Sequence, residues 1–245
     1  VIPTHFRPDR LINAINSVQN QNYRNLEIIV VSDGYDVETE RIVKDKEIND
    51  SRVHFFYYPH SQGGNHARNV GIEHANGEYI AFIDDDDIWY TEKVKMQVQI
   101  LEGCSDIGLV GCGINVLHVD KGISYKTLFK DKGDLSKKIL YSNIIGSTSC
   151  VMVRKEAIEN CGLFDEIMPA RQDYDLWIRI CQKYLVDFVD SVQLDYCVYD
   201  SNGKSQQVSK SLDKYICAHE ILMEKYNYLY NKLSPEEYKI FMADR

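Results

Sequence analysis

An apolar strand that runs directly into four consecutive carboxylates constrains this chain more than any other feature of its sequence. Residues Tyr79–Ile83 are mostly apolar, and Asp84–Asp87 follow at once. The apolar run predicts a buried strand of a parallel sheet. Open α/β sheets bind ligands in the crevice beyond the carboxyl ends of their strands. The stretch therefore predicts an acid-tipped strand at the ligand-binding edge of an α/β sheet.

The four adjacent carboxylates also predict a metal site. They repel one another, and this repulsion raises their pKa values unless a cation or water screens it. A hard divalent ion such as Mg²⁺ or Mn²⁺ takes oxygen ligands and removes the repulsion. Most acidic runs are solvated turns. Here the preceding strand and the following Ile88-Trp89 hold the acids in place, which favours metal binding.

Length and charge set the outer limits on the fold and on the ligands. A chain of 245 residues with 44% hydrophobic and 27% charged residues suffices for one large α/β domain with a helical tail. The net charge of -9 argues against binding to nucleic acid, which requires a basic surface. An anionic substrate must then be met by local cations or by a metal.

The cysteine pattern and the hydropathy indicate a cytoplasmic protein. Seven cysteines are scattered without a Cys-x-x-Cys pair, as expected for reduced, buried thiols. No apolar run approaches the roughly 20 residues of a membrane span, and no signal peptide is visible. The chain starts at Val1, and Val1-Ile2 resembles the end of a strand. We expect further residues upstream, where a signal could lie.

The first third of the chain predicts the opening of a doubly wound sheet. Val1–Thr4 reads as the end of a strand, and Pro8 suits the first turn of a helix. Leu26–Val31 is an unbroken apolar strand that ends at Ser32-Asp33-Gly34. Asp33 lies where ligands are met, but an Asp before Gly also forms turns. Its position alone leaves both interpretations open.

Two glycines open the next predicted helix. Gly63 and Gly64 follow a predicted strand at Val53–Tyr58, and they permit close approach of the backbone to a ligand. Their spacing is neither that of GxGxxG nor that of a P-loop. Arg68 lies about one turn into the helix and can offer a forked donor to phosphate or a nucleobase. A surface arginine is the alternative, but the glycines favour a functional one.

The second half alternates strands and helices and adds one acid of interest. Asp173 is expected in the first turn of a helix that includes Trp177, where the helix dipole favours the ionised acid. An ordinary N-terminal acid is an equally weighted alternative. The other predicted elements are strands at Ile107–Cys112, Ile114–Val119, Cys150–Val153, Val186–Val189 and Val192–Tyr199, an edge strand or loop at Asp120–Gly133, helices at Asp134–Tyr141 and Arg154–Asn160, and a helical tail at Val208–Met242.

Six motifs in order resemble those of the family 2 glycosyltransferases with the GT-A fold, over roughly residues 1–200. The resemblance implies a nucleotide-sugar donor, a divalent Mn²⁺ or Mg²⁺ ion and an inverting displacement. No single motif decides it, but six in order make coincidence improbable. The motifs are Ile2-Pro3-Thr4, Ser32-Asp33-Gly34, Gly63-(x3)-Ala67-Arg68-Asn69-(x)-Gly71, Gly77-Glu78-Tyr79-Ile80, Asp84-Asp85-Asp86-Asp87-(x)-Trp89 and Gln172-Asp173-Tyr174-Asp175-Leu176-Trp177.

The resemblance also implies a role for each site residue. Asp86 matches the direct metal ligand and Asp173 the catalytic base. The nucleotide-sugar contacts that the resemblance implies are Pro3, Thr4, Phe6, Asp33, Arg68, Asp84 and Asp85, with Asp33 at the base and Asp84 or Asp85 toward the ribose. Many relatives place a His after the last strands, whereas this chain has Tyr199-Asp200-Ser201-Asn202-Gly203 there.

These expectations combine into one prediction. Residues 1–205 would form a single Rossmann-like GT-A domain, mostly parallel, with helices on both faces of the sheet, and 206–245 a helical extension. Residues 1–112 would bind the donor, preferably a UDP-sugar, and 113–205 a glycan or lipid-linked glycan acceptor. The product would be a bacterial cell-surface polysaccharide, made in the cytoplasm, with peripheral contact to the inner face of the membrane.

Two alternative functions stay open at this stage. A sugar-phosphate nucleotidyltransferase also uses a metal and a Rossmann-like sheet, but it needs a Gly-rich basic loop near its start, which Ile2–Arg7 does not supply. A catalytically inactive domain that binds nucleotide sugars is the other. The presence of Asp86 and Asp173 argues against inactivity, and only observed turnover excludes it.

Overall fold

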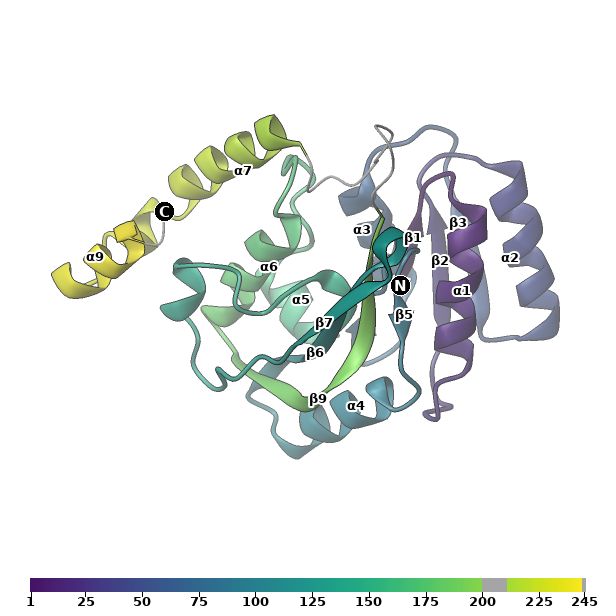
Figure 1. Cartoon of the computed structure of the whole chain (residues 1–245), viewed down its shortest axis with the longest axis horizontal. Helices are drawn as coiled ribbons and strands as arrows, with labels where there is room; N and C mark the ends of the chain where they lie inside the picture. Colours follow the sequence, from purple (N-terminus) through teal and green to yellow (C-terminus); the bar gives the residue numbers. More distant parts are fainter. Residues whose placement is uncertain (200–210, 244–245) are drawn as a thin grey trace.

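The computed structural model describes residues 1–199 and 211–243 and confirms the expected α/β class (Figure 1). It begins with a parallel sheet in the order β1-β2-β3, with β1 at Ile2–Thr4, β2 at Ile28–Ser32 and β3 at Val53–Tyr57. All five residues of β2 are buried, as its continuous apolar run requires. The helices after these strands are α1 at Pro8–Gln19, α2 at Val37–Asn49 and α3 at Gly64–His74.

A short seam joins this sheet to the acid-tipped strand. That strand is β4 at Tyr79–Ala81, two residues shorter than predicted. The nitrogen of Val1 donates a hydrogen bond to the Ala81 carbonyl (2.8 Å), and the Ile83 N–H donates to the Val1 carbonyl (3.1 Å). These bonds place the start of β1 beside the carboxyl end of β4. The acids after β4 therefore lie alongside β1 and the segment that follows it.

The second sheet is mixed, with six strands in the order β4-β8-β6-β9-β5 and β7 paired to β6. Only β6 and β9 run parallel in it, and the other pairs are antiparallel. The parallel strands that we expected thus dominate only the first part of the fold. The strands not yet located are β5 at Ile88–Trp89, β6 at Ile107–His118, β7 at Ile123–Thr127, β8 at Met152–Arg154 and β9 at Leu185–Val198.

Strands β6 and β9 each replace two predicted strands. Their pairing shifts register around Gly113, where Cys112 pairs with Val189 and Gly113 with Val192. The polar pair Asp190-Ser191 is thus accommodated as a bulge inside one long strand. The bulge interrupts the apolar sequence pattern, and for this reason the sequence predicts a strand end there.

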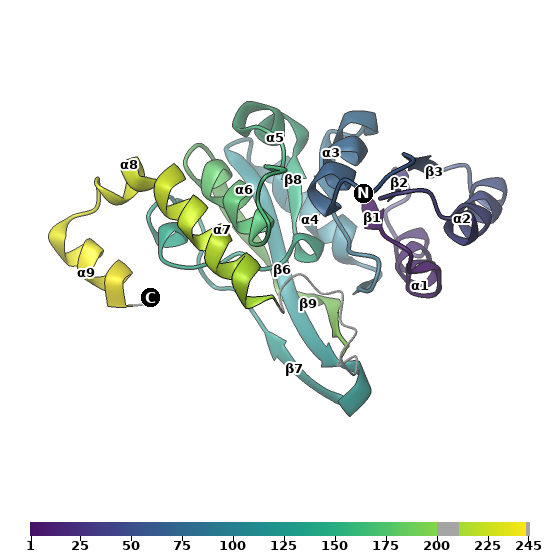
Figure 2. The ribbon, with the colours of Figure 1, turned by 90° about the horizontal axis from the view of Figure 1, so that it is seen from above.

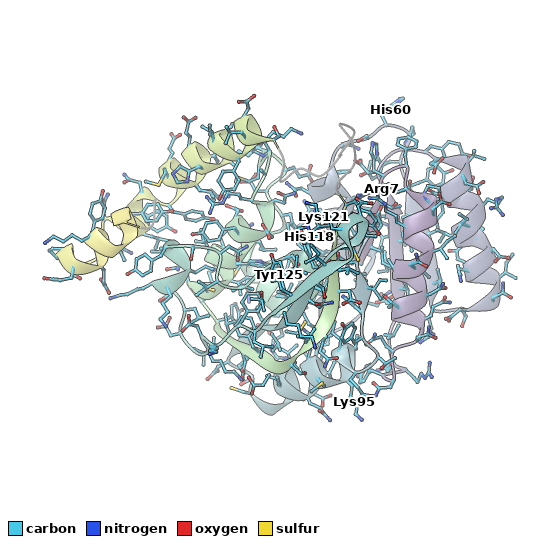
Figure 3. The ribbon with its side chains drawn as sticks, in the orientation of Figure 1. Arg7, His60, Lys95, His118, Lys121 and Tyr125 are labelled. Carbon is cyan, nitrogen blue, oxygen red and sulfur yellow. The ribbon has the colours of Figure 1, made fainter. Side chains whose placement is uncertain are left out.

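The region between β6 and β8 differs from the prediction in one further respect. Strand β7 forms a hairpin with β6 at the edge of the sheet, and His118, Lys121 and Tyr125 extend from this hairpin (Figure 3). The helix that we predicted at Asp134–Tyr141 is wrong, because only a single 3₁₀ turn forms, at Lys138–Leu140. Helix α4 at Lys93–Gly103 packs against β6 and β9, and α5 at Lys155–Cys161 packs against β8 and α6.

The chain ends in the expected helices, which are α7 at Leu212–Lys225, α8 at Asn227–Tyr230 and α9 at Pro235–Ala243 (Figure 2). Helix α7 lies beside α6, at Gln172–Cys181. Ala218 and Leu222 of α7 are buried in the same core as the sheets. The predicted boundary at 205/206 lies outside the described residues. No helix in the described ranges is long and apolar enough to cross a bilayer.

Candidate active site

A cavity of about 670 Å³ opens beyond the carboxyl ends of β1, β2 and β4 and extends to the start of α6 and to α7. Seven of the predicted site residues line it, and they come from five separate segments of the chain. The cavity-lining predictions are Pro3, Thr4, Asp33, Arg68, Asp84, Asp86 and Asp173. The fold thus brings together the donor-side residues and the proposed base. Asp85 and Phe6 do not line the cavity.

Asp85 lies beneath the cavity and binds the segment after β1. Its carboxylate is fully buried, accepts a hydrogen bond from the Thr4 hydroxyl (2.7 Å) and pairs with the Arg7 guanidinium (2.6 Å). Burial raises the pKa of Asp85 to about 6, against the lowering effect of the Arg7 charge. In this structure Asp85 and Thr4 connect β1 to the acid loop. Their predicted contact with the nucleotide stays a prediction.

Phe6 lies at the surface beside the cavity. Its backbone has a positive φ of 51°, and its ring is 53% exposed and contacts His5 edge to face. The strained backbone turns the chain between β1 and α1. The predicted contact of Phe6 with the nucleotide would therefore be made by an exposed ring at the rim of the cavity. Phe6 does not form part of a buried wall.

Asp84 and Asp86 present their carboxylates to the cavity. The Arg7 guanidinium, labelled in Figure 3, contacts Asp86 at 3.0 Å, and Arg10 lies 3.6 Å from the same oxygen. Burial raises the pKa of Asp86, Arg7 opposes the shift and the Asp84 charge adds to it. The repulsion expected from the sequence is present, and arginines from α1 and the segment before it partly compensate it.

Asp87 completes the acid run on its buried side. One of its oxygens accepts a hydrogen bond from the Cys197 N–H in β9 at 2.9 Å. Burial raises the pKa of Asp87 well above its usual value, and the charges of Asp84 and Asp86 raise it further. Asp87 therefore attaches the acid loop to the second sheet and is not available to a ligand.

Arg68 is a buried cation with unused donors. A Cβ on Gly64 would lie 3.2 Å from Arg68 Nη1, so the glycine leaves room for the guanidinium. Nη2 donates to Asp84 at 2.6 Å. The remaining Nε and Nη1 are buried and have no hydrogen-bond partner among the described residues. Buried donors without partners are costly, so these two groups indicate a site for an anionic ligand.

Asp33 holds the loop that precedes α3. Although burial favours its neutral form, hydrogen bonds lower the pKa of Asp33 below the usual value. Gly63, with a positive φ of 99°, directs its N–H to this carboxylate at 3.1 Å. The other donors are the Tyr58 hydroxyl at 2.8 Å, the Ser61 hydroxyl at 2.7 Å and the Gln62 N–H at 2.7 Å. Both interpretations of Asp33 are thus compatible with its place, since it forms the turn and lines the cavity.

Asp173 is the second residue of α6, and few hydrogen bonds hold its carboxylate. Its carboxylate accepts the Tyr174 N–H at 2.8 Å and a long contact of 3.4 Å from the Asn143 amide. Burial raises the pKa of Asp173, the Arg68 charge and the Tyr174 N–H oppose the shift, and the Asp84 charge adds to it. A carboxylate with few partners and a raised pKa has the proton affinity that a general base needs.

Asp175 is two residues further on and has a different environment. It is fully buried and binds Arg179 at 2.8 Å, Lys225 at 2.7 Å and the Tyr226 hydroxyl at 2.7 Å. Lys225 and Tyr226 belong to the C-terminal helices, so Asp175 attaches α7 to α6. It does not line the cavity, and we assign it a structural role.

Comparison with known proteins decides the class. Residues 1–162 match the family profile described as glycosyl transferase family 2. The chain belongs to this family. Among curated relatives, an uncharacterised glycosyltransferase of Rickettsia conorii is 32% identical over 223 residues. That match covers 88% of this chain but only 35% of the relative's length.

A second relative carries a specific name. A Campylobacter jejuni protein named GalNAc(5)-diNAcBac-PP-undecaprenol beta-1,3-glucosyltransferase is 30% identical over 183 residues, which cover 74% of this chain and 58% of that protein. The chain therefore spans only part of these relatives. Together with the family match, these similarities place this chain among the family 2 glycosyltransferases.

Solved structures support the GT-A fold. Staphylococcus aureus TarS 1–349 in complex with UDP-GlcNAc superposes with a TM-score of 0.69 at 16% identity, covering 99% of this chain and 78% of that one. The mannosyltransferase PcManGT from Pyrobaculum calidifontis, in complex with GDP-Man and Mn²⁺, covers 99% of this chain and 72% of that one at 17% identity, with a TM-score of 0.64. At such identities the likeness shows the fold alone.

The carboxylates of this cavity have the oxygen donors that a divalent ion shared with a substrate would need. Among the described residues, no group of three or more His, Cys, Asp or Glu side chains is arranged to hold a metal. Asp84 and Asp86, however, both line the cavity and repel each other. Mg²⁺ and related ions are commonly held by one or two carboxylates together with substrate phosphates. The expected His position after β9 falls largely on residues 200–203, which lie outside the described part.

Sequence reasoning missed several residues of this site, among them Arg7, Asn143, Arg171 and Tyr215. Arg7 follows β1 directly, and only its nearness in sequence to the matched Ile2-Pro3-Thr4 could have suggested it. Asn143 contacts Asp173 from a segment without a readable motif. Arg171 and Tyr215 line the cavity from α6 and α7. They are 44 positions apart in sequence, and no local pattern joins them.

Proposed function

We propose that this glycosyltransferase moves a sugar from a nucleoside-diphosphate sugar to an acceptor hydroxyl with inversion at the anomeric carbon, and that Asp173 is its base. One observation carries the proposal. A single cavity contains both the buried donors of Arg68, which suit a diphosphate, and the loosely held carboxylate of Asp173. An inverting transfer needs an anion site for the leaving group and a base on the acceptor side.

We assign the donor to the half formed by residues 1–112. Arg68 offers two unused N–H groups to the phosphates, and Asp33 holds the loop at the nucleoside end. The likeness to proteins whose titles name UDP-GlcNAc and GDP-Man supports a nucleotide sugar. A UDP-sugar is our preferred donor. Pro3, Thr4, Asp84, Asp85 and the exposed ring of Phe6 complete the proposed nucleotide-sugar contacts.

Asp86, with Asp84, is the proposed holder of the Mn²⁺ or Mg²⁺ ion. When bound, such an ion neutralises the charge that develops on the departing nucleoside diphosphate. The chain's own contribution is to hold the two carboxylates at the cavity wall. Arg7 and Arg10 limit their repulsion, and Arg7 also fixes Asp85 beneath them. Arg68 binds Asp84 and keeps its other donors free.

Asp173 performs the proton transfer in this proposal. Its carboxylate takes the proton from the acceptor hydroxyl while the oxygen attacks the anomeric carbon and the nucleoside diphosphate departs. One displacement inverts the configuration, whereas retention through a double displacement would need a separate positioned nucleophile. The Tyr174 N–H and the Asn143 amide orient the carboxylate.

We assign the acceptor to the half formed by residues 113–205, with the extension at 206–245 beside it. The name of the Campylobacter jejuni relative contains an undecaprenol-linked glycan. We therefore propose a glycan or lipid-linked glycan as acceptor, used for a cell-surface polysaccharide in the cytoplasm at the inner face of the membrane.

The test is a panel of nucleotide sugars measured with and without Mn²⁺. We expect thermal stabilisation by one donor, strongest with Mn²⁺, and release of the nucleoside diphosphate in the presence of a glycan acceptor. An NMR spectrum of the product reports the anomeric configuration. Retention of configuration would reject the mechanism. Release of nucleoside monophosphate and sugar phosphate would point to nucleotide chemistry of another class.

A further inference from the structure

We propose that Arg171 and Tyr215 form a subsite for a negatively charged group on the acceptor. The proposal rests on the glycosyltransferase mechanism above and adds that the acceptor is negatively charged. The acceptor would carry a phosphate or a carboxylate within reach of Arg171, and its sugar ring would pack on Tyr215. Both side chains line the cavity, one from the start of α6 and one from α7.

The Arg171 guanidinium is held between two aromatic rings. Its central carbon lies 4.6 Å from the centre of the Tyr174 ring and 4.8 Å from that of Tyr215. Nη1 lies 3.4 Å from Nδ1 of His219. Such packing restricts the side chain while leaving its charge available, because aromatic faces attract a cation without neutralising it. The guanidinium is thus positioned before any ligand binds.

Arg171 differs from the other cavity arginines in its charge balance. Arg7 and Arg68 each form an ion pair with a carboxylate of the acid run. Within residues 1–199 and 211–243, Arg171 forms no ion pair with a carboxylate. In a chain with a net charge of -9, an arginine that lines a cavity and pairs with no acid is available to an external anion.

The backbone at Arg171 gives independent support. Arg171 has a left-handed φ of 54° and ψ of 28°, and it is the residue that precedes the first turn of α6. Left-handed backbone is unfavourable for a residue other than Gly, and such strain is concentrated at functional sites. A cation at a helix N-terminus is also electrostatically unfavourable, so Arg171 does not serve to stabilise α6.

The place of Arg171 selects the acceptor over the donor. Asp173 is two residues away, and a general base must contact the hydroxyl whose proton it takes. The proposed donor contacts come from other segments, namely β1, β2, α3 and the acid loop. Tyr215 is 45% exposed at the cavity wall, so part of its ring is open to a sugar. A group on Arg171 therefore lies beside the attacking hydroxyl.

The experiment uses three probes that share one sugar ring, namely glucose 6-phosphate, glucuronate and glucose. Their affinities are measured by ligand-observed NMR on the full chain, with UDP and Mn²⁺ present and absent. We expect glucose 6-phosphate or glucuronate to bind at least roughly tenfold more tightly than glucose, as hydrogen bonds to a charged partner allow. Which anion binds better identifies phosphate or carboxylate as the recognised group.

Four variants make the assignment. Arg171→Met should remove the preference for the charged probe and leave UDP affinity unchanged. Arg171→Gly suits the left-handed backbone and provides a second variant that folds. Tyr215→Leu should weaken all three probes. Arg41→Met, at an exposed arginine on α2 that pairs with Glu38, is the matched control and should change nothing.

Several results would overturn the subsite. Equal affinity of the wild type for the three probes, or no measurable affinity for any, would do so. So would a charge preference that survives in both Arg171 variants. A parallel loss of UDP affinity in the Arg171 variants would mean that Arg171 binds the diphosphate of the donor. Failure of the proposed function is seen separately, as absence of UDP and nucleotide-sugar binding in the wild type.

Discussion

The proposed donor side and the proposed acceptor side of the cavity hold their acids in opposite ways. On the donor side, Asp33 is bound by two hydroxyls and two N–H groups, and Asp85 by Thr4 and Arg7. On the acceptor side, Asp173 has one short hydrogen bond, from the neighbouring Tyr174. The acids of the proposed donor half are therefore fixed by several partners, whereas the proposed base is held by few.

The difference follows from the two tasks. Binding a nucleotide benefits from groups whose positions are settled in advance, because their ordering then costs nothing at the moment of binding. A base must instead gain a proton, and each hydrogen bond to its charged form lowers its affinity for that proton. The pKa of Asp33 is lowered and the pKa of Asp173 is raised, in agreement with these two tasks. The following predictions test it in order of expected effect.

The largest effect is expected for Asp173→Asn. Asn keeps the size of the side chain but cannot take a proton, so transfer should fall by about 10²- to 10⁴-fold. Donor affinity and melting temperature should stay near the wild-type values, and kcat and kcat/KM should fall together. Rate, affinity and melting are measured on one preparation. Transfer within about threefold of wild type would remove Asp173 as the base.

Asp86→Ala should abolish the metal dependence of donor binding. The two carboxylates at the cavity wall are reduced to one, and Arg7 and Arg10 lose a partner that they share. Calorimetry with UDP, at several Mn²⁺ concentrations, measures the effect. Unchanged dependence on Mn²⁺ would exclude Asp86 as a ligand. The far-UV circular dichroism spectrum serves as the control for folding.

Asp175→Asn should lower the melting temperature and leave transfer nearly unchanged, which is the reverse of the result expected for Asp173→Asn. Breaking a buried ion pair by removing one charge costs about 3 kcal/mol or more. For a chain of this size that lowers the melting temperature by roughly 6 to 12 °C. Transfer measured well below that temperature should stay within about threefold of wild type. Loss of transfer without loss of stability would mean that the roles of Asp173 and Asp175 had been exchanged.

Asp33→Asn should weaken UDP binding roughly tenfold, as expected for loss of charge-assisted hydrogen bonds, and loosen the loop before α3. Hydrogen exchange should quicken at the amides of Gln62 and Gly63. Because the pKa of Asp33 is lowered on folding, its contribution to stability is present above its ordinary pKa and is lost as pH falls through the lowered value. Melting between pH 5 and pH 3 should therefore depend less steeply on pH in the variant.

The smallest effect is expected at Lys93, a charge buried in the core without a carboxylate partner among the described residues. Its ammonium donates to Gln97 (2.7 Å) and lies 4.0 Å from the centre of the Trp89 ring. Burial lowers the pKa of Lys93 to about 8, so stability rises as pH increases from about 8 toward the unfolded value. Lys93→Met should flatten this rise. Melting curves from pH 7 to 10 that remain parallel to wild type would contradict it.

The sequence was informative where chemistry and strand ends coincide. An apolar strand followed by acids, and a second followed by Asp33, could be placed at one edge of the sheet because parallel strands end together. The place of Asp173 in the first turn of α6 was predicted correctly from the apolar spacing around Trp177. The fold class and the position of these acids at the edge of the sheet could therefore be predicted from the sequence.

Other features depend on contacts that local patterns do not encode. The pairing of Arg7 with Asp85 spans 78 positions, and nothing in the sequence around Arg7 identifies its partner. The bulge at Asp190-Ser191 interrupts β9 without ending it, because β6 shifts its register to accommodate it. The different roles of Asp173 and Asp175 are set by Lys225 and Tyr226, about 50 positions further along the chain.

The seam between Val1 and the Ala81–Ile83 segment bears on how substrates enter and leave. It makes the two sheets continuous, so they cannot swing apart as rigid bodies without breaking backbone hydrogen bonds. Opening must come from segments at the rim, such as the loop that Asp33 holds and the start of α7. Where departure of the nucleotide limits turnover, its rate will then follow the opening of these segments rather than a hinge between domains.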